Sequence, residues 1–277
     1  MRVLILGGTG LTGPFAVRRL SELGHAVTIF HRGEHEVDLP DSVRHLHGSL
    51  TDPAPELRRL DPAVVVHMRA MTQADAAVFL DLFRRAPRAV VISSCDVYQA
   101  YGKLLRRESG PPGPLPLTED SPLRESRFPY HDDYDKILVE QTLRAQTDLP
   151  VTVLRYPAVY GPRDEKRFGS YLKQMAEGAA EIRLPEDFAA WRWTHGFAAD
   201  VAQAVVLAVT EDRAAGRTYN VGEASTPTWK ERVEWLARQE GWRGSVVTAA
   251  AEDSPYDYRH HLVVDSSRIR RELGYPE

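Results

Sequence analysis

The pattern of apolar positions changes repeatedly within the first 30 residues. Residues 2–6 form a short, mostly apolar run, which is typical of a strand buried on both faces of a parallel sheet. Between residues 11 and 23 the apolar side chains recur at roughly helical spacing, and Gly24 follows as a stop signal. Residues 26–30 are rich in β-forming side chains. The segment therefore predicts a strand, a glycine-rich turn, a helix and a second strand.

The same alternation continues to residue 155. Further strands are expected at 43–47, 63–67, 88–93 and 151–155, and helices at 72–85 and 132–146. Strands that alternate with helices are typical of a doubly wound, Rossmann-type α/β fold with a parallel sheet. The proline-rich stretch 99–129 interrupts this rhythm. We expect a long loop there, which is either a lid over the ligand-binding edge or a plain surface excursion.

The elements become shorter after residue 160. Helices are expected at 170–178, 198–209, 229–240 and 266–274, and a strand at 218–221. We therefore expect a dinucleotide-binding domain over residues 1–160 and a smaller lobe over 161–277 that mainly binds substrate. We leave open whether some helices or strands of the second part pack with the first.

Composition narrows the functional classes. The chain has 277 residues, 43% of them hydrophobic, and a net charge of −4, so it lacks the general basic field typical of nucleic-acid binding. Cys95 is the only cysteine, which excludes a disulfide framework. The ten histidines show no metal-binding motif, and no metal site is expected. No apolar run has the length of a membrane span, and a strand directly follows Met1, so we expect a cytoplasmic protein without a signal peptide.

The first turn carries the strongest chemical signal. Gly7, Gly10 and Gly13 have the spacing G-x-x-G-x-x-G between a predicted strand and a predicted helix. In such a turn one glycine permits the tight bend, one lets the backbone approach a pyrophosphate, and one lets helix and strand pack closely. The helix N-terminus beyond it attracts an anion. We therefore expect a dinucleotide to contact Gly7, Thr9, Gly10, Leu11, Thr12 and Gly13.

The end of the second predicted strand bears on the choice of cofactor. NAD sites usually have an acidic residue there for the ribose 2′-hydroxyl, whereas this chain has Arg32. A guanidinium suits a 2′-phosphate, so NADP is favoured over NAD. The alternative is that Arg32 is solvated or stacks on the adenine, which would suit either cofactor.

Several segments together resemble one protein family. They lie at residues 5–13, 65–70, 91–98, 136–140, 154–163, 194–202 and 219–222. They resemble the extended short-chain dehydrogenases/reductases, the group of NAD(P)-dependent nucleotide-sugar epimerases and dehydratases. The resemblance implies hydride exchange between a nicotinamide and a nucleotide-sugar or another small carbonyl or alcohol substrate. It also implies a homodimer.

The resemblance assigns roles to individual residues. Ser94 matches the serine that orients the substrate oxygen, and Lys136 matches the lysine that lowers the pKa of a catalytic tyrosine and holds the nicotinamide ribose. Tyr156 and Pro157 match a segment that contacts the cofactor. Arg155 matches a possible contact for a substrate diphosphate.

Three other residues are open to two interpretations. Arg69 follows the fourth predicted strand, where it either binds an anionic group or faces solvent. Trp191 and Trp193 either line a sugar or aromatic pocket or pack in a core.

The catalytic tyrosine departs from the family pattern. Asp132 stands four residues before Lys136, where the family has tyrosine, and Tyr134 lies on the opposite helical face. Three interpretations remain: the usual chemistry is lost, Asp132 transfers the proton, or Tyr130 or Tyr134 takes the role. The sequence therefore predicts an epimerase-, dehydratase- or reductase-like protein. The alternative is a non-catalytic relative that senses nucleotides or binds RNA.

Overall fold

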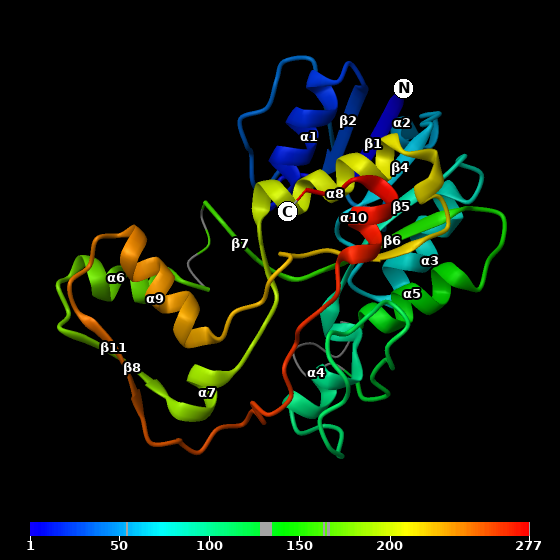
Figure 1. Ribbon diagram of the computed structural model, residues 1–277. Coiled ribbons are helices and arrows are strands. Elements are labelled where there is room, and N and C mark those ends of the chain that lie inside the picture. Colours follow the sequence, from blue (N-terminus) through cyan, green and yellow to red (C-terminus); the bar gives the residue numbers. More distant parts are fainter. Residues whose placement is uncertain (54, 128–134, 163, 165–166, 277) are drawn as a thin grey trace.

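The computed structural model describes residues 1–53, 55–127, 135–162, 164 and 167–276. Within these residues a central sheet has seven strands, all parallel, in the order β10-β6-β5-β4-β1-β2-β3 (Figure 1). The strands are β1 Arg2–Leu6, β2 Ala26–His31, β3 Arg44–His47, β4 Val64–His67, β5 Ala89–Ser94, β6 Val151–Tyr156 and β10 Thr218–Asn220. The predicted doubly wound α/β fold is confirmed, and the predicted strands lie within a residue or two of their expected positions.

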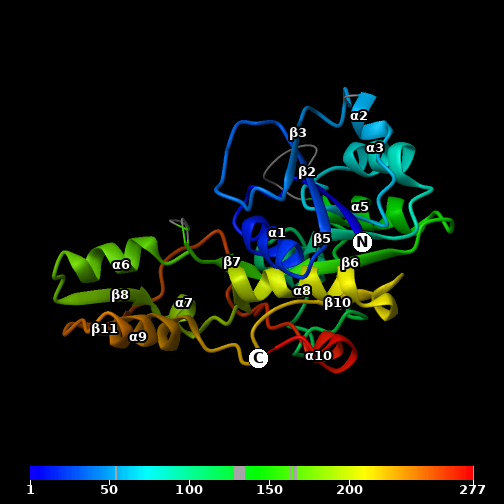
Figure 2. The same ribbon diagram turned by 90° about the horizontal axis from the view of Figure 1, so that it is seen from above.

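Helices cover both faces of this sheet. They are α1 Gly13–Glu22, α3 Gln73–Phe83, α5 Lys136–Arg144, α8 Ala198–Thr210 and α10 Ser267–Leu273. Figure 2 shows β5 and β6 between the pair α1 and α8 and the pair α3 and α5. In β1, Val3 and Ile5 pack into the core on the α1 side, and Leu4 and Leu6 pack into the core on the α3 side. Burial on both faces explains why this strand is an uninterrupted apolar run.

Residues far along the chain return to the central sheet. β10 pairs with β6 in parallel register, from Thr218 opposite Val153 to Asn220 opposite Arg155. α8 contributes Val201, Val205 and other small apolar side chains to the same core as α1. The part of the chain after residue 160 therefore completes the sheet as well as building a second lobe.

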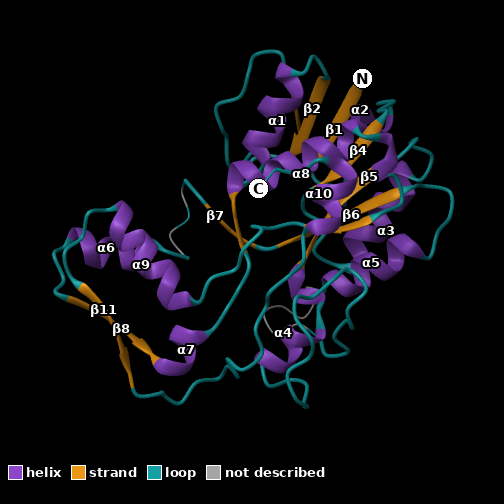
Figure 3. Ribbon diagram, viewed as in Figure 1, coloured by secondary structure: helices purple, strands orange, loops and turns teal. Residues whose placement is uncertain are grey.

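The second lobe has its own small sheet (Figure 3), and its core is rich in aromatic side chains. Its elements are α6 Gly169–Ala176, β8 Glu181–Pro185, α7 Glu186–Ala190, α9 Trp229–Gln239 and β11 Ser245–Ala249, and β8 pairs with β11 in parallel. Between the lobes, β7 Ala158–Tyr160 pairs with β9 His195–Phe197. The sequence predicted α6 and α9 but none of these four strands, which have only three to five residues each.

The stretch 99–129 is not one continuous loop. The prediction was wrong at its start, because Gln99–Leu104 forms the helix α4. The short helices η1 Cys95–Val97 and α2 Pro55–Arg58 were also not predicted. Farther along, Leu117 N–H donates to the carbonyl of Val263 at 2.7 Å, which fastens this stretch to the C-terminal part of the chain.

None of the helices in the described ranges is both long enough and apolar enough to cross a bilayer.

Candidate active site

The three glycines of the first turn occupy three different environments. Gly7 has a φ of +98°, a conformation that favours glycine, and its N–H donates to the carbonyl of Phe30 at 2.8 Å. A Cβ on Gly13 would lie 2.3 Å from the carbonyl oxygen of Gly8, so α1 packs directly on the turn. A Cβ on Gly10 would meet no atom within 4 Å. The turn is therefore bent at Gly7, tightly packed at Gly13 and open at Gly10.

A cavity of about 500 Å³ lies along this turn at the carboxyl edge of the sheet. Its lining includes most of the cofactor residues expected from sequence, namely Gly7, Thr9, Gly10, Leu11, Thr12, Gly13, Lys136, Tyr156 and Pro157. Arg69 also lines it, which favours the first of the two interpretations of that residue. The fold thus brings the glycine turn, the start of α5 and the end of β6 to one place.

A second cavity of about 250 Å³ adjoins the first at the end of β2. Gly7, Thr9 and Arg69 line both cavities, so the two form one trough along the edge of the sheet. Arg32 lines the smaller cavity with a half-exposed side chain. Its guanidinium lies 2.6 Å from a carboxylate oxygen of Glu34, and a ligand phosphate would compete with this ion pair.

Lys136 is buried at the first position of α5. Its Nζ donates to the carbonyl oxygens of Ala70 at 2.7 Å and of Ile92 at 3.1 Å. Burial lowers the pKa of this ammonium to about 8. The Asp135 side chain accepts a hydrogen bond from the N–H of Ile137 at 3.0 Å. This cap starts the helix and so places Lys136 at the cavity.

Of the other expected catalytic residues, only Ser94 belongs to the described part of the chain. The Ser94 side chain accepts a hydrogen bond from the N–H of Asp96 at 3.3 Å, and Ser94 is not among the residues that line the larger cavity. Its neighbour Ser93 does line that cavity and donates to a carboxylate oxygen of Glu140 at 2.6 Å. Asp132, like Tyr130 and Tyr134, lies outside the described residues.

The structure places Arg155 in a buried ion pair. The Arg155 side chain is only 1% exposed and donates to both Glu140 carboxylate oxygens, at 3.0 and 2.8 Å. It also donates to the Tyr98 hydroxyl at 3.0 Å, which in turn donates to Asn220 at 2.6 Å. Arg155 therefore connects β6 to α5 rather than facing a ligand diphosphate.

His67, at the end of β4, was missed by the sequence analysis. Its ring stacks on Phe79 and lines the smaller cavity. Both ring nitrogens are buried without a hydrogen-bond partner in the described parts of the chain. Burial lowers the pKa of His67 to about 3, so the ring is neutral.

An aromatic cavity of about 360 Å³ lies in the second lobe. Its aromatic lining residues are Tyr101, Tyr171, Phe188, Trp191, Trp193, Trp229, Tyr256 and Tyr258. Trp191 and Trp193 therefore face a pocket, although Trp191 also belongs to the aromatic core. The Arg167 guanidinium carbon lies 4.7 Å from the centre of the Trp193 ring, and Arg167 also lines the larger glycine-turn cavity.

Two proteins of related sequence are a reductase and a dehydratase. The 2′-dehydrokanamycin reductase of Streptomyces kanamyceticus is 30% identical over 268 residues, which cover 91% of this chain and 70% of that protein. The dTDP-glucose 4,6-dehydratase of Streptomyces griseus is 30% identical over 160 residues, which cover 57% of this chain and 47% of that protein.

Solved structures share the fold at lower identity. UDP-glucose 4-epimerase from Thermotoga maritima, solved with UDP-glucose, has a TM-score of 0.75 and 19% identity and covers 99% of this chain and 93% of its own. The dTDP-glucose 4,6-dehydratase DesIV from Streptomyces venezuelae, solved with NAD, has a TM-score of 0.72 and 23% identity. The match covers 100% of this chain and 92% of the DesIV chain. These likenesses support the fold alone.

One family model matches most of the chain. The model of the NAD dependent epimerase/dehydratase family matches residues 3–222. This range contains the glycine turn, Lys136 and the seven strands of the central sheet except for Arg2, the first residue of β1. The resemblance seen in the sequence is confirmed, and the chain belongs to the NAD-dependent epimerase/dehydratase family.

Proposed function

We propose that this chain is an NAD(P)-dependent oxidoreductase that interconverts a carbonyl and an alcohol on a sugar-like substrate and prefers NADP to NAD. The observation that best supports the proposal is that the glycine turn, Lys136 and the end of β6 line one cavity of about 500 Å³. In doubly wound proteins, ligands bind at this carboxyl edge of the sheet. A bound nicotinamide would supply the hydride.

The walls of the trough suit a dinucleotide. Gly10 leaves open space beside the turn, and the ten-residue helix α1 begins at Gly13, which lines the same cavity. His67 lines the smaller cavity with a buried, neutral ring. Arg32 would bind the 2′-phosphate of NADP there, in exchange for its ion pair with Glu34. Lys136 would hold the nicotinamide ribose in the larger cavity.

Proton transfer is assigned to residues near the start of α5. Ser94 would orient the substrate oxygen, and Asp132 or Tyr134 would exchange the proton with it. Replacing Asp132 by tyrosine separates the interpretations. If Asp132→Tyr raises turnover of a keto-sugar, the native site lacks its usual proton donor. If the substitution abolishes existing turnover, Asp132 carries the proton.

The aromatic cavity is the proposed substrate site. Aromatic rings offer flat apolar surfaces with polar edges, which suit the face of a sugar ring. The similarity to a reductase and a dehydratase, whose names specify carbohydrate substrates, supports this class. Arg167 lies between this cavity and the proposed cofactor cavity and so would face both ligands.

A fluorescence titration with NADPH and with NADH tests the proposal. We expect NADPH to bind roughly tenfold to a hundredfold more tightly, since a hydrogen bond to a charged group contributes about 1.5 to 3 kcal/mol. Arg32→Ala should remove this preference and leave NADH binding unchanged.

The exposed Arg18→Ala serves as the control and should alter neither affinity. A preference for NADH would overturn the NADP assignment alone. If neither cofactor binds in its reduced or oxidised form, the proposed function is wrong.

A further inference from the structure

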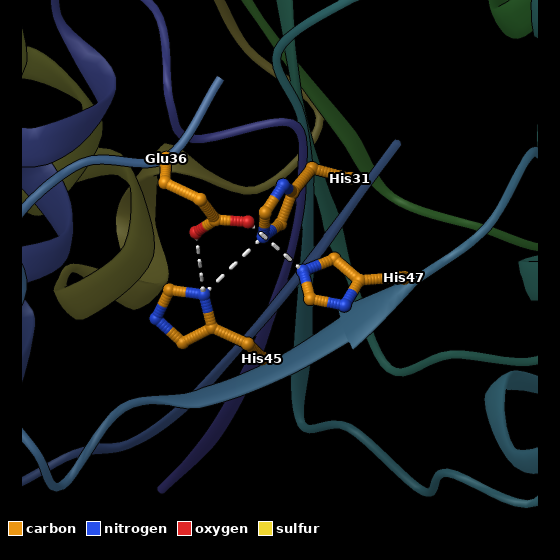
Figure 4. Close-up of side chains that lie close together, drawn as sticks. All are labelled: His31, Glu36, His45 and His47. Atoms are coloured by element: carbon orange, nitrogen blue, oxygen red, sulfur yellow. Dashed lines mark hydrogen bonds and ion pairs between the residues drawn. The ribbon is translucent and has the colours of Figure 1, made fainter. Parts of the chain in front are cut away.

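Three histidines gather on one face at the edge of the central sheet. β2 and β3 pair in parallel, with His31 opposite His47. His45 precedes His47 by two residues in the same strand, so all three side chains point to the same side. Their ring centres lie 4.6 to 6.4 Å apart. Glu36 extends over them from the connection between the strands (Figure 4).

The ligand-type atoms of these four residues converge. Nε2 of His31 lies 3.3 Å from Nδ1 of His45. The Glu36 carboxylate oxygens lie 3.2 Å from Nε2 of His47 and 3.8 Å from Nδ1 of His45. One ligand atom from each residue lies within 4.8 Å of all the others. In a tetrahedral zinc site with bonds of about 2.1 Å, ligand atoms are about 3.4 Å apart, so a small contraction would complete the shell.

We propose that His31, Glu36, His45 and His47 bind a divalent transition-metal ion, with Zn²⁺ as the best match. Three imidazoles and one carboxylate favour zinc over magnesium or calcium, which prefer oxygen ligands. Four protein ligands in a closed tetrahedron are typical of a structural rather than a catalytic zinc site.

The surroundings of the cluster suit this role. His31 is buried on the rigid strand β2, whereas His47 and Glu36 are more than half exposed and leave a path for the ion. β3 is a four-residue edge strand, and the ion would fasten it and the preceding connection to β2. The N–H of Gly33 donates to Nδ1 of His31 at 3.3 Å. A metal on Nε2 would place the ring proton on Nδ1, so metal binding would break this long hydrogen bond.

No metal site was expected from the sequence, because the ten histidines show no metal-binding motif. His45-x-His47 on a strand was the available signal, since alternate residues of a strand share a face. Strand pairing then adds His31, which no short motif would reveal.

The test is metal binding by the tag-free full chain after treatment with a chelator. Zn²⁺ affinity is measured by competition with a chromophoric chelator, without any nicotinamide cofactor. We expect one ion per chain. Glu36→Gln and His47→Ala should each weaken binding more than about a hundredfold, which exceeds the 10- to 100-fold effect of losing an outer partner of a metal ligand. Co²⁺ should give the intense visible absorption of a tetrahedral site.

His35→Ala is the matched control, because this exposed histidine lies beside Glu36 but outside the cluster. It should retain full affinity. Absence of stoichiometric binding would overturn the proposal. So would a loss in His35→Ala equal to that in His47→Ala, or an octahedral Co²⁺ spectrum. Because the readout needs no cofactor, its failure is distinguishable from failure of the proposed oxidoreductase function.

Discussion

At the scale of single residues, the glycines of the first turn separate packing from ligand approach. Gly13 contacts the backbone of Gly8, so any added side-chain atom there must displace the main chain. Gly10 faces open space and has no such constraint. An added methyl group should therefore lower the free energy of unfolding at Gly13 but not at Gly10, although both glycines belong to the same sequence motif.

Gly13→Ala should destabilise the protein by about 1 to 3 kcal/mol, the usual cost of overpacking. Gly10→Ala should leave the free energy of unfolding nearly unchanged and still weaken NADPH binding, because its methyl group would occupy the space proposed for the pyrophosphate. Urea denaturation and cofactor titration measure the two effects. Gly113→Ala, also in open space but remote from the site, is the control. Equal losses of stability in Gly10→Ala and Gly13→Ala would contradict the distinction.

Lys136 gives stability a pH dependence. Its pKa is about 8 in the folded protein against an ordinary value of 10.5, so between these values the unfolded chain binds more protons than the folded one. The free energy of unfolding therefore increases as the pH rises from about 8 to 10.5, and it decreases again as the pH is lowered through the same range. Relative to Lys136→Met, the wild type should gain about 2 kcal/mol between about pH 7 and 9.5. Denaturation of both proteins at several pH values checks this, and a constant difference would refute it.

At the scale of elements, the ion pair between Arg155 and Glu140 connects β6 to α5, the helix that carries Lys136. Removing one partner of a buried pair leaves an uncompensated charge, so Arg155→Met should cost about 3 to 5 kcal/mol. The double variant Arg155→Met with Glu140→Leu should be more stable than Arg155→Met alone, since neither charge remains. Thermal or urea unfolding of the set measures the coupling. Simple additivity of the two substitutions would show that the pair is not coupled.

The elements predicted from sequence are those whose signal is local. β1, α1 and β2 were recognised because a strand buried on both faces and a helix buried on one have distinct apolar periods. β8 and β11 were missed because each is short and depends on a partner more than 60 residues away. The glycine turn was predicted because its chemistry lies within seven residues. The histidine cluster was not predicted, and an aromatic pocket was only one of two interpretations of Trp191 and Trp193, because tertiary packing brings the residues of both sites together.

At the scale of the whole molecule, residues 1–160 do not complete the central sheet. Without β10 the edge of β6 is unpaired, and without α8 the core residues beside α1 are exposed. A fragment ending at residue 160 should therefore aggregate or remain unfolded. Size-exclusion chromatography and circular dichroism of the fragment, compared with the full chain, test this. A monomeric fragment with cooperative unfolding would show that the sheet is stable without the returning elements.

Arg167 lies in the walls of two cavities, one beside the glycine turn and one in the second lobe. Its guanidinium stacks on Trp193 in the aromatic cavity, while the same residue lines the cavity beside the glycine turn. A ligand that shifts this side chain in one cavity changes a wall of the other. Thermodynamic reciprocity then requires each ligand to alter the affinity of the other by the same factor. The order in which the two ligands arrive therefore cannot change their combined binding free energy, only its division between the two steps.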